Sequence, residues 1–428
     1  MKYRKYFKVG LIIALSLFIA SVSIAKGPNP RPLVPAYLTD GWNQISPEAG
    51  FTYLGLSPAC SNCPGLPNTP YTFFVRKGAI NKVLIFFDGG GACWDPMNCI
   101  QWPYVNMVLN GATPPSSPDY INPFTYTPFI SENVISGQFF DGANPIDEGI
   151  FDFDDPRNPF KDWYVVYLPY CTGDLFWGAN DYAYPDEVGT FAGVPQTIHH
   201  RGFVNFQAVL KWVKVNFKNP KQMFVTGSSA GGYGAIMDFP FIKNAFPAVR
   251  VDVLGDAANG ITGDNFNAKA DLVWDVQYPA WIFPEGVDDL TSEDLYMNIA
   301  AEYPFSKLAQ YTAAFDSTQI WFYHLQLDDI VGQPVYWYDT AGIMAAYPVW
   351  NYIMSAYVHD TAAGASNYRY YMAKGQLHTI LTRDAFYTEN SAGGIYFYAW
   401  IKGMIDMPNG LGVPPHNPWK NLENNMPY

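Results

Sequence analysis

A serine between two glycines is the first feature of the sequence that could do chemistry. Ser229 stands at the centre of Gly-Ser-Ser-Ala-Gly, residues 227–231. The preceding run, 222–225, is short, apolar and strand-like, and the segment from Ala235 onward is typical of a helix. Glycines are needed on a sharp strand-to-helix turn because side chains there would collide with both elements. The pattern therefore predicts a nucleophile elbow that lifts the Ser229 hydroxyl above the end of a sheet.

A serine hydroxyl is a weak nucleophile, so it needs a base and a carboxylate that orients the base. In α/β-hydrolases the acid and then the histidine follow the serine, each on a loop just beyond a strand. His378 meets both conditions, because it follows the aromatic-rich strand predicted at 368–373. The other histidines precede the serine, lie within predicted elements or stand in a Pro-rich tail: His199, His200, His324, His359 and His416.

Asp328 is the predicted acid, because it follows a strand predicted at 319–325 and precedes His378 in the chain. Asp329 beside it is one competitor, and Asp256, which follows an earlier predicted strand, is another. For any single aspartate the alternative is a turn or helix-cap residue. The expected triad is therefore Ser229, Asp328 and His378.

A glycine triplet, residues 89–91, follows the buried strand predicted at 83–87. Because these residues have no side chains, their backbone N–H groups can approach a developing negative charge closely. Together with the N–H of Ala230, the residue after the nucleophile, they would form an oxyanion hole. A plain turn is the alternative, but binding alone requires no such set of elbow, acid, histidine and triplet.

The elements that must position these groups alternate along the chain. Strands are predicted at 71–76, 83–87, 163–168, 222–225, 249–254, 319–325 and 368–373, and helices at 200–217, after the elbow and near 392–404. This alternation predicts an α/β fold of the α/β-hydrolase type, with a mostly parallel sheet and helices on both faces. We expect one domain over 26–428, with an aromatic-rich insertion near 100–160 and a second near 260–315.

The first 25 residues have the features of a secretory signal peptide. Basic residues precede an apolar run over 9–20, and small residues follow at 23 and 25. The apolar run is too short to span a membrane comfortably. The sequence predicts cleavage before Lys26, export to the periplasm or the exterior, and no stable membrane insertion.

The charge of the chain bounds its partners. The sequence has 25 Lys and Arg against 38 Asp and Glu, a net charge of -13. The predicted signal peptide carries four basic residues and no acidic one, so the mature chain would have 21 against 38, or -17. Such a charge disfavours nucleic acid and anionic membrane surfaces as partners.

Five cysteines in an exported chain are candidates for disulfides. They are Cys60, Cys63, Cys93, Cys99 and Cys171. Cys60-x-x-Cys63 has no second cysteine pair or histidine at zinc spacing, so no metal site is predicted. The sequence leaves the oligomeric state open.

Taken together, these motifs resemble those of the pectin acetylesterase and Notum carboxylesterase family of secreted serine hydrolases. The likeness is carried by the following segments: Phe87-Asp88-Gly89-Gly90-Gly91-Ala92-Cys93 with Cys99, Tyr170-Cys171-Thr172-Gly173-Asp174, Arg201-Gly202, Gly227-Ser228-Ser229-Ala230-Gly231-Gly232 and Leu254-Gly255-Asp256-Ala257. The resemblance implies an oxyanion hole made by Gly90, Gly91 and Ala230. It also makes Asp256 a structural residue and not the triad acid.

The same resemblance implies a Cys93–Cys99 disulfide, and a bridge from Cys171 to Cys60 or Cys63. It implies a secreted carboxylic-ester hydrolase with a triad of Ser229, Asp328 and His378 and with no metal or cofactor. Its leading substrate would be an O-acetylated polysaccharide such as pectin.

Two features depart from that expectation. Ala92 stands where the family usually has an aromatic residue near the acyl group, and a charge of -17 would be repelled by polyanionic pectin. Less charged acetylated polymers, a lipid or acylated protein and an aromatic ester are therefore alternative substrates. A glycan-binding module without turnover and a peptidase are alternatives of other classes.

Overall fold

The computed structural model describes residues 38–61, 69–101, 105, 140–141, 144–145, 147–263, 266–408 and 416–427. The chain divides into a short unit, Met1–Arg31, and a large one, Pro32–Tyr428. The predicted signal peptide, Cys63 and most of the insertion predicted near 100–160 lie outside the described residues. Among the described residues, none of the helices has both the length and the apolar character needed to cross a membrane.

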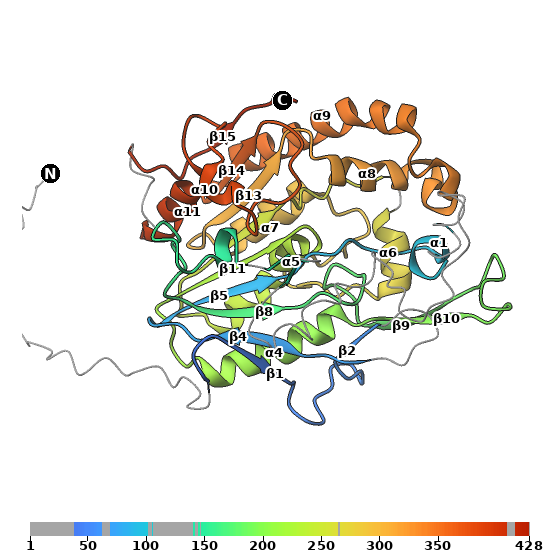
Figure 1. The fold of residues 1–428 in the computed structure, drawn as a ribbon, viewed down its shortest axis with the longest axis horizontal. Helices are drawn as coiled ribbons and strands as arrows, with labels where there is room; N and C mark the ends of the chain where they lie inside the picture. Colours follow the sequence, from blue (N-terminus) through green and yellow to red (C-terminus); the bar gives the residue numbers. More distant parts are fainter. Residues whose placement is uncertain are drawn as a thin grey trace, which may run out of the picture. The chain divides into compact units, whose positions relative to one another are not determined.

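A nine-stranded sheet runs through the large unit, in the order β1-β4-β8-β5-β11-β12-β13-β14-β15 (Figure 1). The strands are β1 (Trp42–Ile45), β4 (Phe73–Arg76), β5 (Lys82–Phe87), β8 (Tyr164–Leu168), β11 (Gln222–Ser228), β12 (Val251–Asp256), β13 (Leu308–Ala313), β14 (Tyr368–Ala373) and β15 (Leu422–Glu423). All neighbours from β8 to β15 pair in parallel, whereas β4 pairs antiparallel with β1 and β8. The predicted fold class, a mostly parallel sheet of the α/β-hydrolase type, is confirmed.

Side chains alternate between two cores, one on each face of this sheet. In β5, Val83, Ile85 and Phe87 join the larger core, and Leu84 and Phe86 join the smaller one. A strand buried on both faces reads as a continuous apolar run, which is why β5 was recognisable in the sequence. Each fully buried side chain of this size contributes about 1.5–3 kcal/mol to folding.

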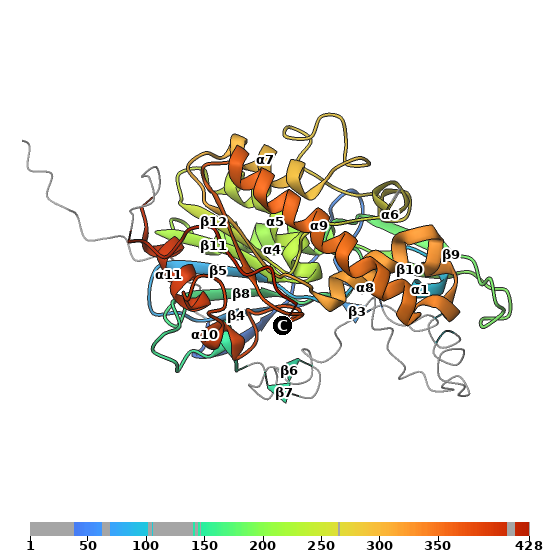
Figure 2. The same ribbon diagram turned by 90° about the horizontal axis from the view of Figure 1, so that it is seen from above.

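Helices cover both faces of the sheet, as the alternation of elements predicted (Figure 2). The larger core contains side chains from α4 (Gly202–Asn216), α5 (Ala230–Ala245), α6 (Phe266–Trp274), α7 (Ser292–Glu302), α8 (Ser317–Gln326) and α9 (Thr340–Gly364). The smaller core contains side chains from η1 (Gly149–Phe151), α10 (Ala385–Thr388) and α11 (Phe397–Asp406).

One predicted strand is wrong. Residues 319–325 belong to helix α8, and the strand that takes the predicted place in the sheet is β13, which lies inside the insertion predicted at 260–315. Within α8, Ile320, Tyr323 and His324 are buried whereas Trp321 and Phe322 are partly exposed. That spacing is helical, but the run was predicted as a strand because aromatic and β-branched residues are enriched in strands.

Short elements and two disulfides complete the described part. The remaining elements are β2 (Ala59–Cys60), β3 (Thr69–Pro70), α1 (Pro96–Cys99), β6 (Phe140–Asp141), β7 (Asn144–Pro145), β9 (Asn180–Tyr184), β10 (Gln196–His200), η2 (Leu327–Gly332) and η3 (Pro334–Tyr336). Cys93 is bonded to Cys99, as predicted, and Cys171 is bonded to Cys60. Disulfides of this kind are consistent with an exported protein.

Candidate active site

Ser229 occupies a strained turn between β11 and α5. Its backbone has φ 56° and ψ -123°, a conformation that residues other than glycine rarely adopt. A Cβ at Gly227 would lie 2.3 Å from the carbonyl oxygen of Gly231, and one at Gly231 would lie 2.1 Å from that of Phe87. The glycines of the motif are therefore required by close backbone approach, and the geometry is that of the predicted elbow.

His378 lies beyond the end of β14 and is paired with a buried carboxylate. Its Nδ1 is 2.9 Å from Oδ2 and 3.0 Å from Oδ1 of Asp316. The Asp316 side chain is fully buried, and 18% of the His378 side chain is exposed. A protonated Nδ1 that donates to Asp316 leaves Nε2 as the basic nitrogen of the ring.

Asp316 is held in place by the start of α8. It is the N-cap residue of that helix, and its Oδ1 accepts hydrogen bonds from the backbone N–H groups of Thr318 and Gln319, both at 3.0 Å. Its Oδ2 accepts from the side-chain amide of Gln319 at 2.9 Å. Because these donors fix both oxygens, the carboxylate presents a preorganised partner to His378.

The structure pairs His378 with Asp316 and not with the predicted acid, Asp328. Asp328 lies in η2, in a left-handed conformation with φ 47°, and it is exposed. Its competitor Asp329 is also exposed and forms an ion pair with Lys269. The structure brings neither of them to His378, because the strand expected to end at 325 is a helix and the strand before the acid is β13.

A signal for Asp316 was present in the sequence. Asp316-Ser-Thr-Gln319 has the spacing of a helix-start motif, in which an aspartate caps the helix and a Gln or Glu follows three residues later. This cap predicts a helix that begins at 317. The strand before the helix would then be assigned to the preceding apolar run.

The environment of His378 favours its protonated form. Burial lowers the pKa of His378, but the charge and hydrogen bond of Asp316, aided by the charge of Asp256, outweigh burial. Arg383 acts in the opposite direction. The net result is a pKa above its ordinary value, which suits a base that must take and hold a proton during a reaction.

The glycine triplet approaches the elbow closely. A Cβ at Gly89 would lie 2.7 Å from the carbonyl oxygen of Ser228 and 3.3 Å from Cβ of Ser229. Gly90 and Gly91 have φ of 154° and 80°. Ala230 begins α5, where the first N–H groups of a helix have no intrahelical acceptor. The triplet thus lies next to Ser229 at Gly89, and Gly91 and Ala230 line the same pocket as Ser229 and His378.

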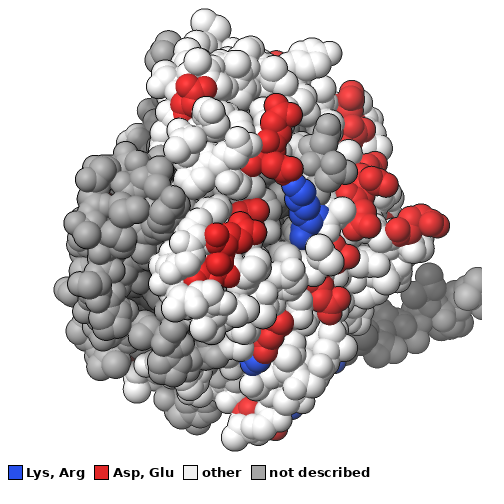
Figure 3. All heavy atoms as spheres, turned by 90° about the vertical axis from the view of Figure 1, so that its right-hand side faces the viewer, with Lys and Arg blue, Asp and Glu red and all other residues white. Residues whose placement is uncertain are grey.

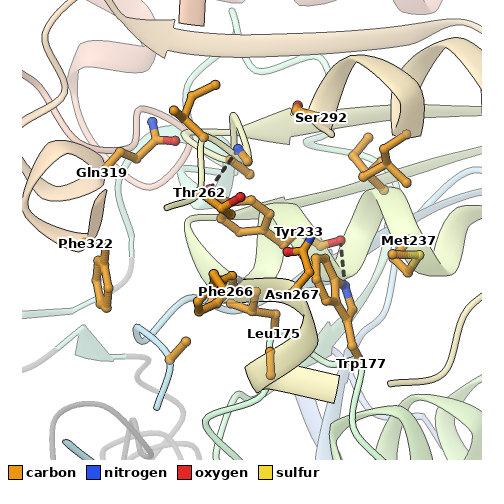
Figure 4. A pocket seen from close by; sticks show the side chains of 18 of the residues that line it. Leu175, Trp177, Tyr233, Met237, Thr262, Phe266, Asn267, Ser292, Gln319 and Phe322 are labelled. Carbon is orange, nitrogen blue, oxygen red and sulfur yellow. Dashed lines mark hydrogen bonds between the residues drawn. The ribbon is translucent and has the colours of Figure 1, made fainter. Parts of the chain in front are cut away.

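That pocket is mostly apolar (Figure 4). It holds about 1080 Å³ of empty space, part of it continuous with solvent. Beyond the reacting groups, its walls come from the loop after β8, from α5 and from the second insertion. The apolar lining side chains include Leu175, Trp177, Ile236, Met237, Phe266, Val276, Val287, Leu290, Leu295 and Phe322. Ala92 lines the pocket too, and its small side chain leaves room beside the nucleophile.

One cluster of metal-ligand residue types occurs among the described residues, but it does not form a metal site. It consists of Cys93, Cys99 and His200. The two sulfur atoms are bonded to each other. Burial lowers the pKa of His200 to about 3, and its ring nitrogens contact the hydroxyl of Tyr184 and the carbonyl oxygen of Thr172. This group is a satisfied part of the core.

Comparisons with known proteins bear on the family resemblance and on the fold of the chain. The model of the pectinacetylesterase family matches residues 143–275, a span that contains Ser229 but ends before Asp316 and His378. Among solved structures, the Wnt deacylase Notum from Drosophila is similar, with a TM-score of 0.52 and 14% identity over 89% of this chain and 99% of that chain. At that identity the likeness shows the fold alone. No curated protein matches the chain. The resemblance of this chain to the pectin acetylesterase and Notum family is thereby confirmed.

Proposed function

We propose that the protein is a secreted serine carboxylesterase, with Ser229 as nucleophile, His378 as base and Asp316 as the residue that orients the base. The observation that carries the proposal is the hydrogen-bonded pair of His378 and Asp316 in a pocket that Ser229 also lines. The comparisons support an esterase or deacylase activity. The identity of the acid rests on the geometry.

In the first half of the reaction, Oγ of Ser229 attacks the ester carbonyl carbon while Nε2 of His378 accepts the hydroxyl proton. The tetrahedral intermediate then collapses, the bond to the alcohol oxygen breaks, and His378 returns the proton to the departing alkoxide. In the second half, water attacks the acyl-serine in the same way and the carboxylic acid leaves. The Asp316 carboxylate stabilises the imidazolium that forms in each half.

The negative charge on the carbonyl oxygen needs donors that are in place beforehand. Gly90, Gly91 and Ala230 are the proposed sources of backbone N–H groups, because the triplet and the start of α5 both border Ser229. Loss of one such donor typically lowers kcat by about 10²–10³.

The first test is a Ser229→Ala variant. Turnover of p-nitrophenyl acetate by the wild-type protein should be lost in this variant, with kcat lower by about 10⁶-fold, as is typical when a triad serine is removed. A fluorophosphonate probe should label the wild-type protein and not the variant, because it reports an activated serine.

Two results would contradict the proposal. Ester turnover by the Ser229→Ala variant at the wild-type rate would exclude this mechanism. A wild-type protein that binds glycans but is neither labelled nor active would instead indicate a binding module. Amide substrates measured beside esters separate a peptidase from an esterase.

An O-acetylated polysaccharide remains the first proposed substrate, by resemblance to the pectin acetylesterases. The pocket supports a second candidate, an ester with a longer or aromatic acyl group, because an acetyl group would leave most of its apolar wall without contact. Acidic side chains also outnumber basic ones on the face shown in Figure 3. That distribution favours a neutral alcohol partner over a polyanion such as polygalacturonate.

A further inference from the structure

The carboxylate of Asp256 connects two segments that the reaction must keep in register. Asp256 ends β12, and its fully buried side chain accepts hydrogen bonds from three donors. Its Oδ2 accepts from the Ser228 hydroxyl at 2.8 Å, from the Ile380 N–H at 3.0 Å and from the Leu381 N–H at 2.9 Å. The first donor precedes the nucleophile, and the other two follow the base.

The backbone of the same residue holds the nucleophile itself. The carbonyl oxygen of Asp256 accepts a hydrogen bond from the Ser229 N–H at 2.8 Å. One residue therefore contacts the elbow through its main chain and the His378 loop through its side chain. Because β13 lies between β12 and β14 in the sheet, the side-chain contacts with the His378 loop cross over the end of a strand and do not belong to the sheet ladder.

The loop that carries His378 needs such support. Thr379, the next residue, has φ 60°, in the left-handed region that residues other than glycine rarely adopt. Such a conformation persists only where the surroundings impose it. The two backbone N–H groups bound by Asp256 come directly after Thr379 and fix the peptide units there.

We propose that Asp256 is a positioning residue, which sets the placement of His378 relative to Ser229 and adds a second negative charge that acts on the imidazole. The inference rests on the proposed function, in which Ser229 and His378 react together. The role differs from that of Asp316, because Asp256 makes no hydrogen bond with His378.

The charged groups near Asp256 and His378 determine how kcat/KM should depend on pH. His378 is influenced by Asp316, Asp256 and Arg383. Burial raises the pKa of Asp256 to about 6, although its donors lower it, and the Asp256 charge in turn raises the pKa of the buried Tyr311. The charge of Asp256 raises the pKa of His378, so removal of that charge should move the acid limb of the kcat/KM profile to lower pH.

The test compares Asp256→Asn with Asp174→Asn. Asp174 is a matched control, because it is also fully buried, has a pKa raised to about 6 by burial and accepts from one hydroxyl and two backbone N–H groups. Its donors, on Thr172, Phe176 and Gly202, belong to neither the elbow nor the His378 loop.

For Asp256→Asn, we expect kcat/KM per folded enzyme to fall by about 10- to 10²-fold, mainly in kcat, because small misplacement of a reacting group has effects of that size. The acid limb should move to lower pH, and the amides of Ile380 and Leu381 should exchange hydrogen faster. Asp174→Asn should lower the melting temperature, but it should neither move the acid limb nor speed hydrogen exchange at Ile380 and Leu381.

If Asp256→Asn fails to fold, Ser228→Ala is the variant to measure instead. It removes only one donor to the carboxylate and should move the acid limb in the same direction by a smaller amount. An unchanged acid limb and unchanged hydrogen exchange in a folded Asp256→Asn variant would overturn the inference. A shifted acid limb and faster exchange at Ile380 and Leu381 in Asp174→Asn would overturn it as well. Failure of the proposed function is seen separately, as a wild-type protein without ester turnover or fluorophosphonate labelling.

Discussion

Asp316 combines two roles that are often given to different residues. It caps α8, and it accepts the hydrogen bond from His378. A cap contributes about 1 kcal/mol to stability, whereas an acid behind a catalytic histidine affects kcat far more strongly. The two roles can therefore be separated by comparing a loss of stability with a loss of rate.

At the residue scale, Asp316→Asn should lower kcat by about 10³–10⁴-fold, because the amide disfavours the tautomer with a proton on Nδ1 and withdraws the charge that stabilises the imidazolium. Asp328→Asn is the matched control and should leave kcat within about twofold, since Asp328 is exposed and lies beyond the opposite end of α8 from Asp316. Steady-state kinetics on one ester measure both. Equal rates for the two variants would contradict the assignment of Asp316.

The pH profile supplies a second readout for the same pair. His378 must be neutral to accept a proton, and its pKa is raised above the ordinary value. Wild-type kcat/KM should therefore fall as the pH decreases through that raised pKa. In Asp316→Asn the residual activity should persist to lower pH, because the largest influence that raises the pKa has been removed. A shift toward higher pH would contradict this explanation.

At the element scale, sequence reasoning was reliable where one strand lies buried between two cores. Strands β5, β8, β11, β12 and β14 and helix α4 lie within a few residues of their predicted positions. The elbow, the base and the glycine triplet follow from those elements because their motifs are local. For Asp316 the local signal was only the helix-cap pattern at 316–319, and its recognition depended on which of two apolar runs formed the strand.

The pairing of distant segments could not be read from the chain either. Residues 308–313 pair with both β12 and β14, and 319–325 pack as a helix with α9. Both runs have residue types that suit a strand. Which of the two forms the strand therefore depends on tertiary neighbours and not on local propensity. The same holds for Asp256, whose donors at 380 and 381 are remote in sequence.

The apolar pocket leads to a prediction about acyl length, again at the element scale. Met237 on α5 is buried and contributes to the pocket wall (Figure 4). Met237→Trp should fill part of the space and lower kcat/KM for octanoyl and longer p-nitrophenyl esters by about tenfold or more, while acetate turnover is retained. Met344→Trp, at an exposed site on α9, is the control. Unchanged long-chain turnover in a folded Met237→Trp variant would exclude this pocket as the acyl site.

At the scale of the whole molecule, charge governs which polymers approach the site. The chain has a net charge of -13, and surface charges are screened within about 10 Å at 0.1 M salt. Acetate release from polyanionic pectin should therefore rise when salt is added, whereas release from neutral acetylated xylan should stay constant. Initial rates at two salt concentrations decide this. A decrease with salt for pectin would reveal a locally basic groove.

The last strand of the sheet gives the C-terminal segment an influence on the base. β15 pairs with β14, the Asn424 N–H donates to the Met372 carbonyl oxygen at 2.9 Å, and the Gly375 N–H donates to that of Met426 at 2.8 Å. Gly375 stands three residues before His378. Shortened versions of the chain made for expression should therefore keep residues 421–427. Exopeptidase trimming of this segment should therefore lower the proposed ester turnover while Ser229 and its turn remain intact.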